Sequence, residues 1–197
     1  MARLATAPNN VTDLLEVFRI GLVNGLWDNQ LVVAWADARV LAEDAPSEVV
    51  LDLALSGHRS RNDLISALDT YVGCPRPLVA GRVVLGWLHQ QYAAGTIPLE
   101  RVVRTLDWLQ WHGTLTEAEG VSLAGVDDEY AVAVAGHRGS VAAAVEALGQ
   151  YVRSFLACYE PLELDNPTAW AGLVPAVTGR VQALLHERNL HNSQGTF

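Results

Sequence analysis

Two short segments of this chain combine a glycine, a histidine and an arginine in the same order. They are Gly57-His58-Arg59 and Gly136-His137-Arg138, and each is followed by a serine and, further on, by Tyr-Val. An imidazole beside a guanidinium could bind a carboxylate of a partner. The same residues also suit a helix end, where a glycine takes up the left-handed conformation and basic side chains interact with the helix dipole. The pattern leaves a binding role and a structural role open for both Gly-His-Arg turns.

The other histidines and the cysteines do not form a pattern typical of a metal site or of catalysis. His186 and His191 are five residues apart, whereas the histidines of a zinc-protease helix are four apart and so face one metal. Cys74 and Cys158 lack the neighbours of a catalytic nucleophile, and reduced thiols are favoured over a disulfide. The acidic run 127–129 is interpreted as stabilising a helix start. We therefore expect no metal, no cofactor and no catalytic residue.

A pair of tryptophans is a further candidate for binding. Trp108 and Trp111 are three residues apart and share one face of a predicted helix, whose apolar stripe is already supplied by other residues. At least one of the two is therefore expected to be exposed. Exposed tryptophan is enriched at the centres of protein interfaces, so Trp108 and Trp111 are candidate binding residues beside the two Gly-His-Arg turns.

Composition limits the classes of partner. Half of the 197 residues are hydrophobic and 18% are charged, which predicts an extensive core. The formal net charge of −9 argues against binding nucleic acid and against binding an anionic membrane, because both need a basic face. No segment offers about 18 consecutive apolar residues, so no membrane span is predicted. The first residues lack the apolar core of a secretory signal, and a cytoplasmic location is expected.

The elements that must position these residues are all predicted to be helices. Residue types typical of N-caps precede several apolar stripes: Asn10 with Asp13, Asp28, Ser47, Ser60 with Asp63, and Ser140. Glycines are predicted to end the preceding helices, Gly57 and Gly136 among them. A last helix is expected to begin at Asn166-Pro167, with a kink or a break near Pro175. Gly81 and Gly86, inside a helix, are interpreted as allowing close helix packing.

The two halves of the chain match each other beyond the Gly-His-Arg turns. At an offset of 70 residues, the pattern Leu15, Phe18, Leu22, Gly25 falls on Leu85, Leu88, Tyr92, Gly95. We therefore predict an all-α protein made by internal duplication, with two tandem four-helix units at 11–73 and 78–156 and a C-terminal helical segment at 166–191. Residues 1–10 are expected to be disordered or extended. The units would pack as a helical array or as a bundle, and form one compact domain.

The halves resemble small bacterial helical proteins in which a Gly turn containing an aromatic residue or a histidine precedes a helix that starts with Ser or Thr. That resemblance implies a bacterial, cytoplasmic protein. The leading hypothesis is a non-enzymatic protein-interaction module, such as a scaffold, a regulator or an immunity-type binder of a basic partner, with self-association as a compatible option. The alternative is a small-molecule or metal-dependent enzyme with a site between the two units, near His58 or His137.

Overall fold

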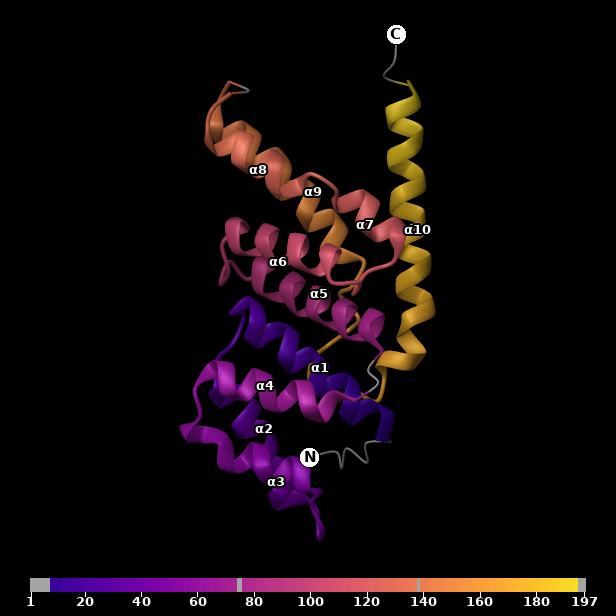
Figure 1. Cartoon of the computed structure of the whole chain (residues 1–197). Helices are drawn as coiled ribbons and strands as arrows, with labels where there is room; N and C mark the ends of the chain where they lie inside the picture. Colours follow the sequence, from indigo (N-terminus) through magenta and orange to yellow (C-terminus); the bar gives the residue numbers. More distant parts are fainter. Residues whose placement is uncertain (1–7, 74–75, 138, 195–197) are drawn as a thin grey trace. The chain divides into compact units, whose positions relative to one another are not determined.

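The computed structural model describes residues 8–73, 76–137 and 139–194, and all the regular secondary structure in these ranges is helical. No strand occurs in these ranges, as Figure 1 shows, so the prediction of an all-α fold is confirmed. The chain divides into two compact units, Met1–Arg76 and Pro77–Phe197. No helix within the described residues is long and apolar enough to cross a membrane.

The first unit consists of four α-helices and one 3-10 turn. In chain order they are α1 (Pro8–Asn24), α2 (Asn29–Ala42), α3 (Glu48–Ala54), the 3-10 helix η1 (Leu55–His58) and α4 (Arg61–Val72). Helix α1 packs against α4, and α2 packs against α3. Three of the predicted N-caps are confirmed: the side chains of Asp28, Ser47 and Ser60 accept hydrogen bonds from the first turns of α2, α3 and α4.

The second unit is built around α5, which is buried along most of its length. Its helices are α5 (Pro77–Ala93), α6 (Leu99–Trp111), α7 (Glu117–Leu123), α8 (Val126–Val134), α9 (Val141–Ala157) and α10 (Trp170–Gln194). Helices α6, α9 and α10 all contact α5, and α8 packs against both α6 and α9. The predicted cap Ser140 is confirmed at the start of α9.

Two glycines of α5 allow the backbone of neighbouring segments to lie very close to this helix. A Cβ atom at Gly81 would lie 2.3 Å from the carbonyl oxygen of Thr114, and one at Gly86 would lie 2.3 Å from the carbonyl oxygen of Leu162. Backbone carbonyls cannot move aside cheaply, so only glycine allows these approaches. Close packing at Gly81 and Gly86 is therefore observed, but the neighbours are backbone carbonyls of the segments that follow α6 and α9, not another helix as predicted.

Helices in both units are followed by a glycine in the left-handed conformation, but the helix end predicted at Gly57 is wrong. Gly136 has φ 74° and follows α8 as predicted. Gly57 lies inside η1, outside the left-handed region. The chain continues from α3 directly into η1, where the Ser56 hydroxyl donates to the Leu53 carbonyl (2.6 Å) and the Arg59 amide donates to the Ser56 carbonyl (2.9 Å). These bonds end the element at His58 without a left-handed residue.

The start of α1 also differs from the prediction. The helix begins at Pro8, so Asn10 is not its N-cap, and residues 8–10 are helical rather than extended. Asp13 is buried and accepts hydrogen bonds from the backbone amide (3.2 Å) and Nε (2.9 Å) of Arg76. A partner 63 residues away has thus replaced the predicted local cap, because burial of the carboxylate requires a charged partner. Residues 1–7 lie outside the described part of the chain.

The last helix begins later than predicted. Residues 163–169 form turns, in which the Asn166 side chain accepts from the Thr168 hydroxyl (3.1 Å), and α10 starts at Trp170. Trp170 is buried, and its Nε1 donates to the Glu163 carbonyl (2.8 Å). Helix α10 runs through Pro175 without a break. The missing amide of Pro175 costs one helical hydrogen bond, and burial of Val177 and Val181 just beyond it stabilises the continuous helix.

Candidate functional site

In the Gly-His-Arg turn of the first unit, the two predicted binding residues differ in their surroundings. His58 is exposed at the end of η1. Arg59 forms a two-pronged ion pair with Asp52 of α3, with Nη1–Oδ2 at 2.8 Å and Nη2–Oδ1 at 2.7 Å. Tyr71 of α4 donates its hydroxyl to the same carboxylate (2.9 Å). The guanidinium of Arg59 is therefore engaged within the unit, and it ties the loop before α4 to α3.

This arrangement shifts the pKa values of all three side chains. The hydrogen bonds from Arg59 hold the pKa of Asp52 below its ordinary value of 3.8, and that of Tyr71 is raised because its hydroxyl donates to the carboxylate. The pKa of Arg59 is raised by its bond to Asp52. Each shift moves a pKa further from neutral pH and favours the protonation state already present there, which is typical of an ion pair and not of a general acid or base.

The Gly-His-Arg turn of the second unit follows α8. His137 is exposed there, next to the left-handed Gly136. Arg138 lies outside the described residues, as does Cys74. The two turns belong to different units, so the hypothesis of an enzyme with a site between the units stays a prediction. Within the part of the chain described here, no group of three or more His, Cys, Asp or Glu side chains could hold a metal ion.

The C-terminal end of α6 presents the predicted tryptophan pair. Trp111 is 75% exposed, and its Nε1 donates to Asp107 Oδ1 one turn earlier (3.0 Å). Trp108 is half-buried and stacks on His112, with ring centroids 3.8 Å apart and ring planes 9° apart. The His112 ring is also placed by a 2.7 Å contact between its Nδ1 and the Trp108 carbonyl oxygen. The expectation that at least one tryptophan is exposed is confirmed.

Helix α7 packs against α6 and has exposed residues of its own. Gln110 of α6 lies against Gly120 of α7, where its Cγ would be 3.7 Å from an added Cβ. On α7 the exposed side contains Glu117, Ala118 and Val121, and Val121 is 70% exposed. We call Trp108, Trp111 and His112 together with this side of α7 the aromatic surface. It combines aromatic and apolar side chains with the carboxylate of Glu117.

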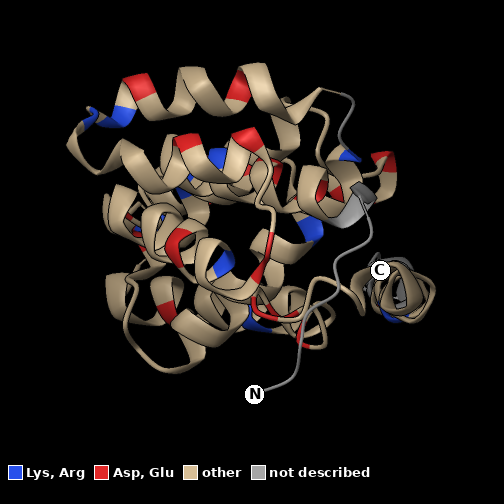
Figure 2. Ribbon diagram, turned by 90° about the horizontal axis from the view of Figure 1, so that it is seen from below, with Lys and Arg blue, Asp and Glu red and all other residues tan. Residues whose placement is uncertain are grey.

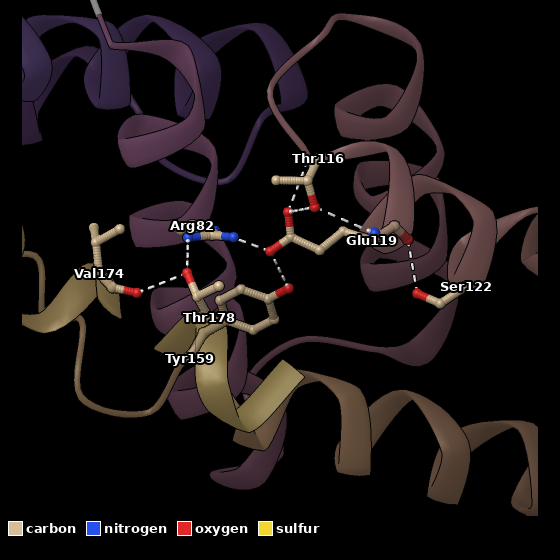
Figure 3. Close-up of polar contacts among 7 residues, drawn as sticks. All are labelled: Arg82, Thr116, Glu119, Ser122, Tyr159, Val174 and Thr178. Atoms are coloured by element: carbon tan, nitrogen blue, oxygen red, sulfur yellow. Dashed lines mark hydrogen bonds and ion pairs between the residues drawn. The ribbon is translucent and has the colours of Figure 1, made fainter. Parts of the chain in front are cut away.

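A second feature, which the sequence reasoning missed, is a buried polar cluster in the same unit (Figure 3). Its centre is Glu119 of α7, which is fully buried. Glu119 Oε1 accepts from Arg82 Nε of α5 (2.9 Å) and from the Tyr159 hydroxyl (2.8 Å). Glu119 Oε2 accepts from the amide (2.7 Å) and the hydroxyl (2.6 Å) of Thr116. Arg82 Nη1 donates to Thr178 of α10 (2.9 Å), so the cluster joins α5, α7 and α10.

The charge states in this cluster are set by competing effects. Burial by itself raises the pKa of Glu119, but the hydrogen bonds from Thr116 and the charge of Arg82 outweigh burial and hold it below its ordinary value of 4.5. Burial, and then the neighbouring carboxylate, raises the pKa of Tyr159 far above its ordinary value of 10.0. Glu119 is thus ionised and Tyr159 neutral. All four contacts of the carboxylate come from the protein itself, which indicates a structural role.

Part of this cluster has a signal in the sequence. Thr116 and Glu119 have the spacing of a capping box, and the structure contains that box at the start of α7. Arg82 is the only charged residue of α5, an otherwise apolar helix, which indicates a buried partner. The identity of the partner depends on the packing of α5 against α7, so the pair could not be assigned from the sequence.

Comparison with known proteins adds no relative: no family model matches the chain, and neither a curated protein nor a solved structure shows a significant match.

Proposed function

We propose that this chain is a non-enzymatic protein-interaction module that binds a basic protein through the aromatic surface of its second unit. The observation that carries the proposal is the exposure of Trp111, a large side chain at a helix end whose orientation is held by Asp107. An aromatic anchor that is already ordered loses little entropy on binding. The stacked Trp108 and His112 lie at the same helix end, and Val121 is an exposed apolar side chain of the neighbouring helix α7.

The preference for a basic partner comes from charge. The net charge is −9, and acidic segments are spread over the ribbon in Figure 2. Glu117 of the aromatic surface is exposed, as are the three acids 127–129 at the start of α8, the next helix in the chain. A partner with arginine or lysine would meet these carboxylates, and a cation could also stack on the face of Trp111. A scaffold, regulator or immunity-type binder in a bacterial cytoplasm is the form we propose.

We also propose that the two tandem units at 11–73 and 78–156 arose by duplication. Their helix ends support it. After α1, the backbone amides of Leu26 and Gly25 donate to the carbonyls of Gly21 and Leu22. After α5, the corresponding amides of Thr96 and Gly95 donate to the carbonyls of Gln91 and Tyr92. The helix pairs support it too. Helix α1 packs against α4 and α2 against α3, and in the second unit α5 packs against α9 and α6 against α8. An experimental structure in which these ranges cannot be superposed would contradict duplication.

The function is tested by retrieving partners with the tagged full-length protein from cells of its source. Wild type is compared with Trp111→Ala and with Val134→Ala, a matched control that truncates an exposed side chain of α8. We expect at least one basic protein to be retained by wild type and the control and lost by Trp111→Ala. With that partner purified, Trp111→Ala should weaken binding by about 30-fold or more, as for a hot spot of at least 2 kcal/mol.

Urea unfolding should not distinguish the three proteins, since both substituted side chains are exposed. Retrieval of the protein alone would contradict the proposal. So would a set of partners that is unchanged by Trp111→Ala.

A further inference from the structure

Helix α2 of the first unit exposes an apolar row that nothing in that unit covers. Leu31, Ala34, Ala38 and Leu41 are all exposed, and Leu41 is 88% exposed. Their spacing of three, four and three residues places them in one narrow stripe along the helix, the spacing by which one helix packs along another. At 1.5 Å per residue the row is roughly 15 Å long.

The opposite side of α2 is apolar as well, because Val32, Val33 and Ala36 are buried in the unit. A helix that is apolar on both sides is expected to be covered on both sides. The outer row is therefore not explained by folding of the unit.

Helix α3 and η1, which follow α2, add two more exposed leucines. Leu51 and Leu55 are four residues apart and so lie on one side of this segment, and Leu55 is 75% exposed. Helices α2 and α3 pack against each other, and the Asn29 side chain at the start of α2 donates to the Arg59 carbonyl just after η1 (3.0 Å). We call the row on α2 together with Leu51 and Leu55 the leucine face.

The charges around the leucine face are almost all negative. From Asp28 to Arg59 the sequence has six acidic residues and two arginines. Both arginines form ion pairs within the unit, Arg39 with Glu43 and Arg59 with Asp52. Asp28, Asp37, Asp44 and Glu48 are exposed. A second copy of this chain would bring these acids against identical acids, which disfavours self-association here.

From these observations we infer that the leucine face is a docking site for an amphipathic helix with basic flanks, carried by another protein. Its apolar side would lie on the leucines of α2 and α3, and its arginines or lysines would meet the surrounding carboxylates. This site is on the first unit and goes beyond the aromatic surface, which is on the second. The two sites do not share a residue, so each is tested without the other.

The test uses the full-length protein and two synthetic helical peptides as probes. Both peptides carry leucines at positions i, i+3, i+7 and i+10; one has arginines at its flanking positions and the other has glutamates. Calorimetry at low and at physiological salt measures binding. The arginine peptide should bind with a Kd of about 1–100 μM, corresponding to roughly 5.5–8 kcal/mol. Its affinity should fall with salt, and the glutamate peptide should bind at least about tenfold more weakly.

Variants locate the site. Leu31→Gln with Leu41→Gln should weaken the arginine peptide at least about tenfold, or roughly 1.4 kcal/mol. Trp111→Ala, the matched control on the second unit, should leave the affinity unchanged. Circular dichroism should show all variants folded, because the substituted side chains are exposed. Hydrogen exchange should show protection by the peptide in residues 29–55.

Three results would overturn the inference. The first is no binding of either peptide, or equal binding of both. The second is binding that the leucine variants leave intact, which would indicate general attraction to an acidic protein. The third is a dimer of the protein, measured by light scattering, that Leu41→Gln dissociates, because a second copy would then cover the face.

Discussion

Each unit of this protein contains an arginine, a carboxylate and a tyrosine bound together, and the two groups differ in burial. In the first unit, Arg59 and Tyr71 bond to Asp52, and both charged side chains are 28% exposed. In the second unit, Arg82 and Tyr159 bond to Glu119, and the charged side chains are 5% and 0% exposed. The residue types and the distances are nearly the same.

The difference in burial decides what each group contributes. Water can replace a lost partner around Asp52, so that pair has little effect on stability. Around Glu119 water is excluded, so removal of one partner leaves a buried charge that nothing else compensates. The buried group also joins three helices that are distant in sequence. We therefore expect the same kind of substitution to have unequal effects in the two units.

The largest effect is expected for Glu119→Gln. The substitution keeps the size of the side chain but leaves the buried guanidinium of Arg82 without its counter-charge, so the free energy of unfolding should fall by about 3–5 kcal/mol. Urea unfolding measures the loss. Hydrogen exchange should show it in α5, α7 and α10, which the cluster joins.

A double variant sharpens this result. Arg82→Met combined with Glu119→Leu removes both charges, and it should lose less stability than Glu119→Gln alone. If the double variant is the less stable of the two, the ion pair itself is a net source of stability and our account of its energetics is wrong.

The tyrosines should show the next largest difference. Tyr159→Phe removes one hydrogen bond to a buried carboxylate and should cost about 1.5–3 kcal/mol. Tyr71→Phe removes the corresponding bond to Asp52, where water can take its place, and should cost less than about 1 kcal/mol. Equal losses in parallel urea titrations would show that burial does not separate the two groups.

Lowering the pH should reduce the stability that the buried group contributes, because Glu119 becomes protonated. Its pKa is lower in the folded protein than the ordinary 4.5, so the unfolded chain takes up a proton first as the pH falls. Stability from this group is complete above about pH 4.5 and is lost as the pH falls through the folded pKa. Urea unfolding between about pH 7 and pH 3 should therefore show a flatter acid limb for Glu119→Gln than for wild type. Parallel limbs would contradict the assignment.

The smallest effect is expected for Asp52→Asn. A partly exposed ion pair contributes little to stability because water and salt screen it, and high salt should reduce even this difference from wild type. A loss as large as that of Glu119→Gln would mean that the turn at Arg59 is a structural centre of the first unit. The comparison between the two groups would then fail.

Much of the helix pattern could be predicted because its causes are local. Ser60 and Asp63 cap each other within one turn, and the structure contains that capping box. Gly136 ends α8 for an equally local reason. The prediction failed at Gly57 and at Asn10. At Gly57 a 3-10 turn takes the place of a left-handed helix end. At Asn10 the predicted capping partner, Asp13, bonds instead to the distant Arg76.

The candidate binding residues divide in the same way. Exposure of at least one of Trp108 and Trp111 could be predicted, because the apolar stripe of α6 was complete without them, but only the structure shows that it is Trp111. Engagement of Arg59 by Asp52 could not, since the pair joins the loop before α4 to α3.

The sequence by itself determined that the chain is helical, where most helices begin and that the protein is acidic. Caps, apolar stripes and net charge depend on residues within about one helical turn or on composition alone. Only the tertiary structure decided which carboxylate lies in water and which is buried. Arg82 is 37 residues from Glu119 and 96 from Thr178, and such distances are closed by helix packing, which no local pattern specifies. The leucine face became visible for the same reason, because exposure is a property of the packed unit.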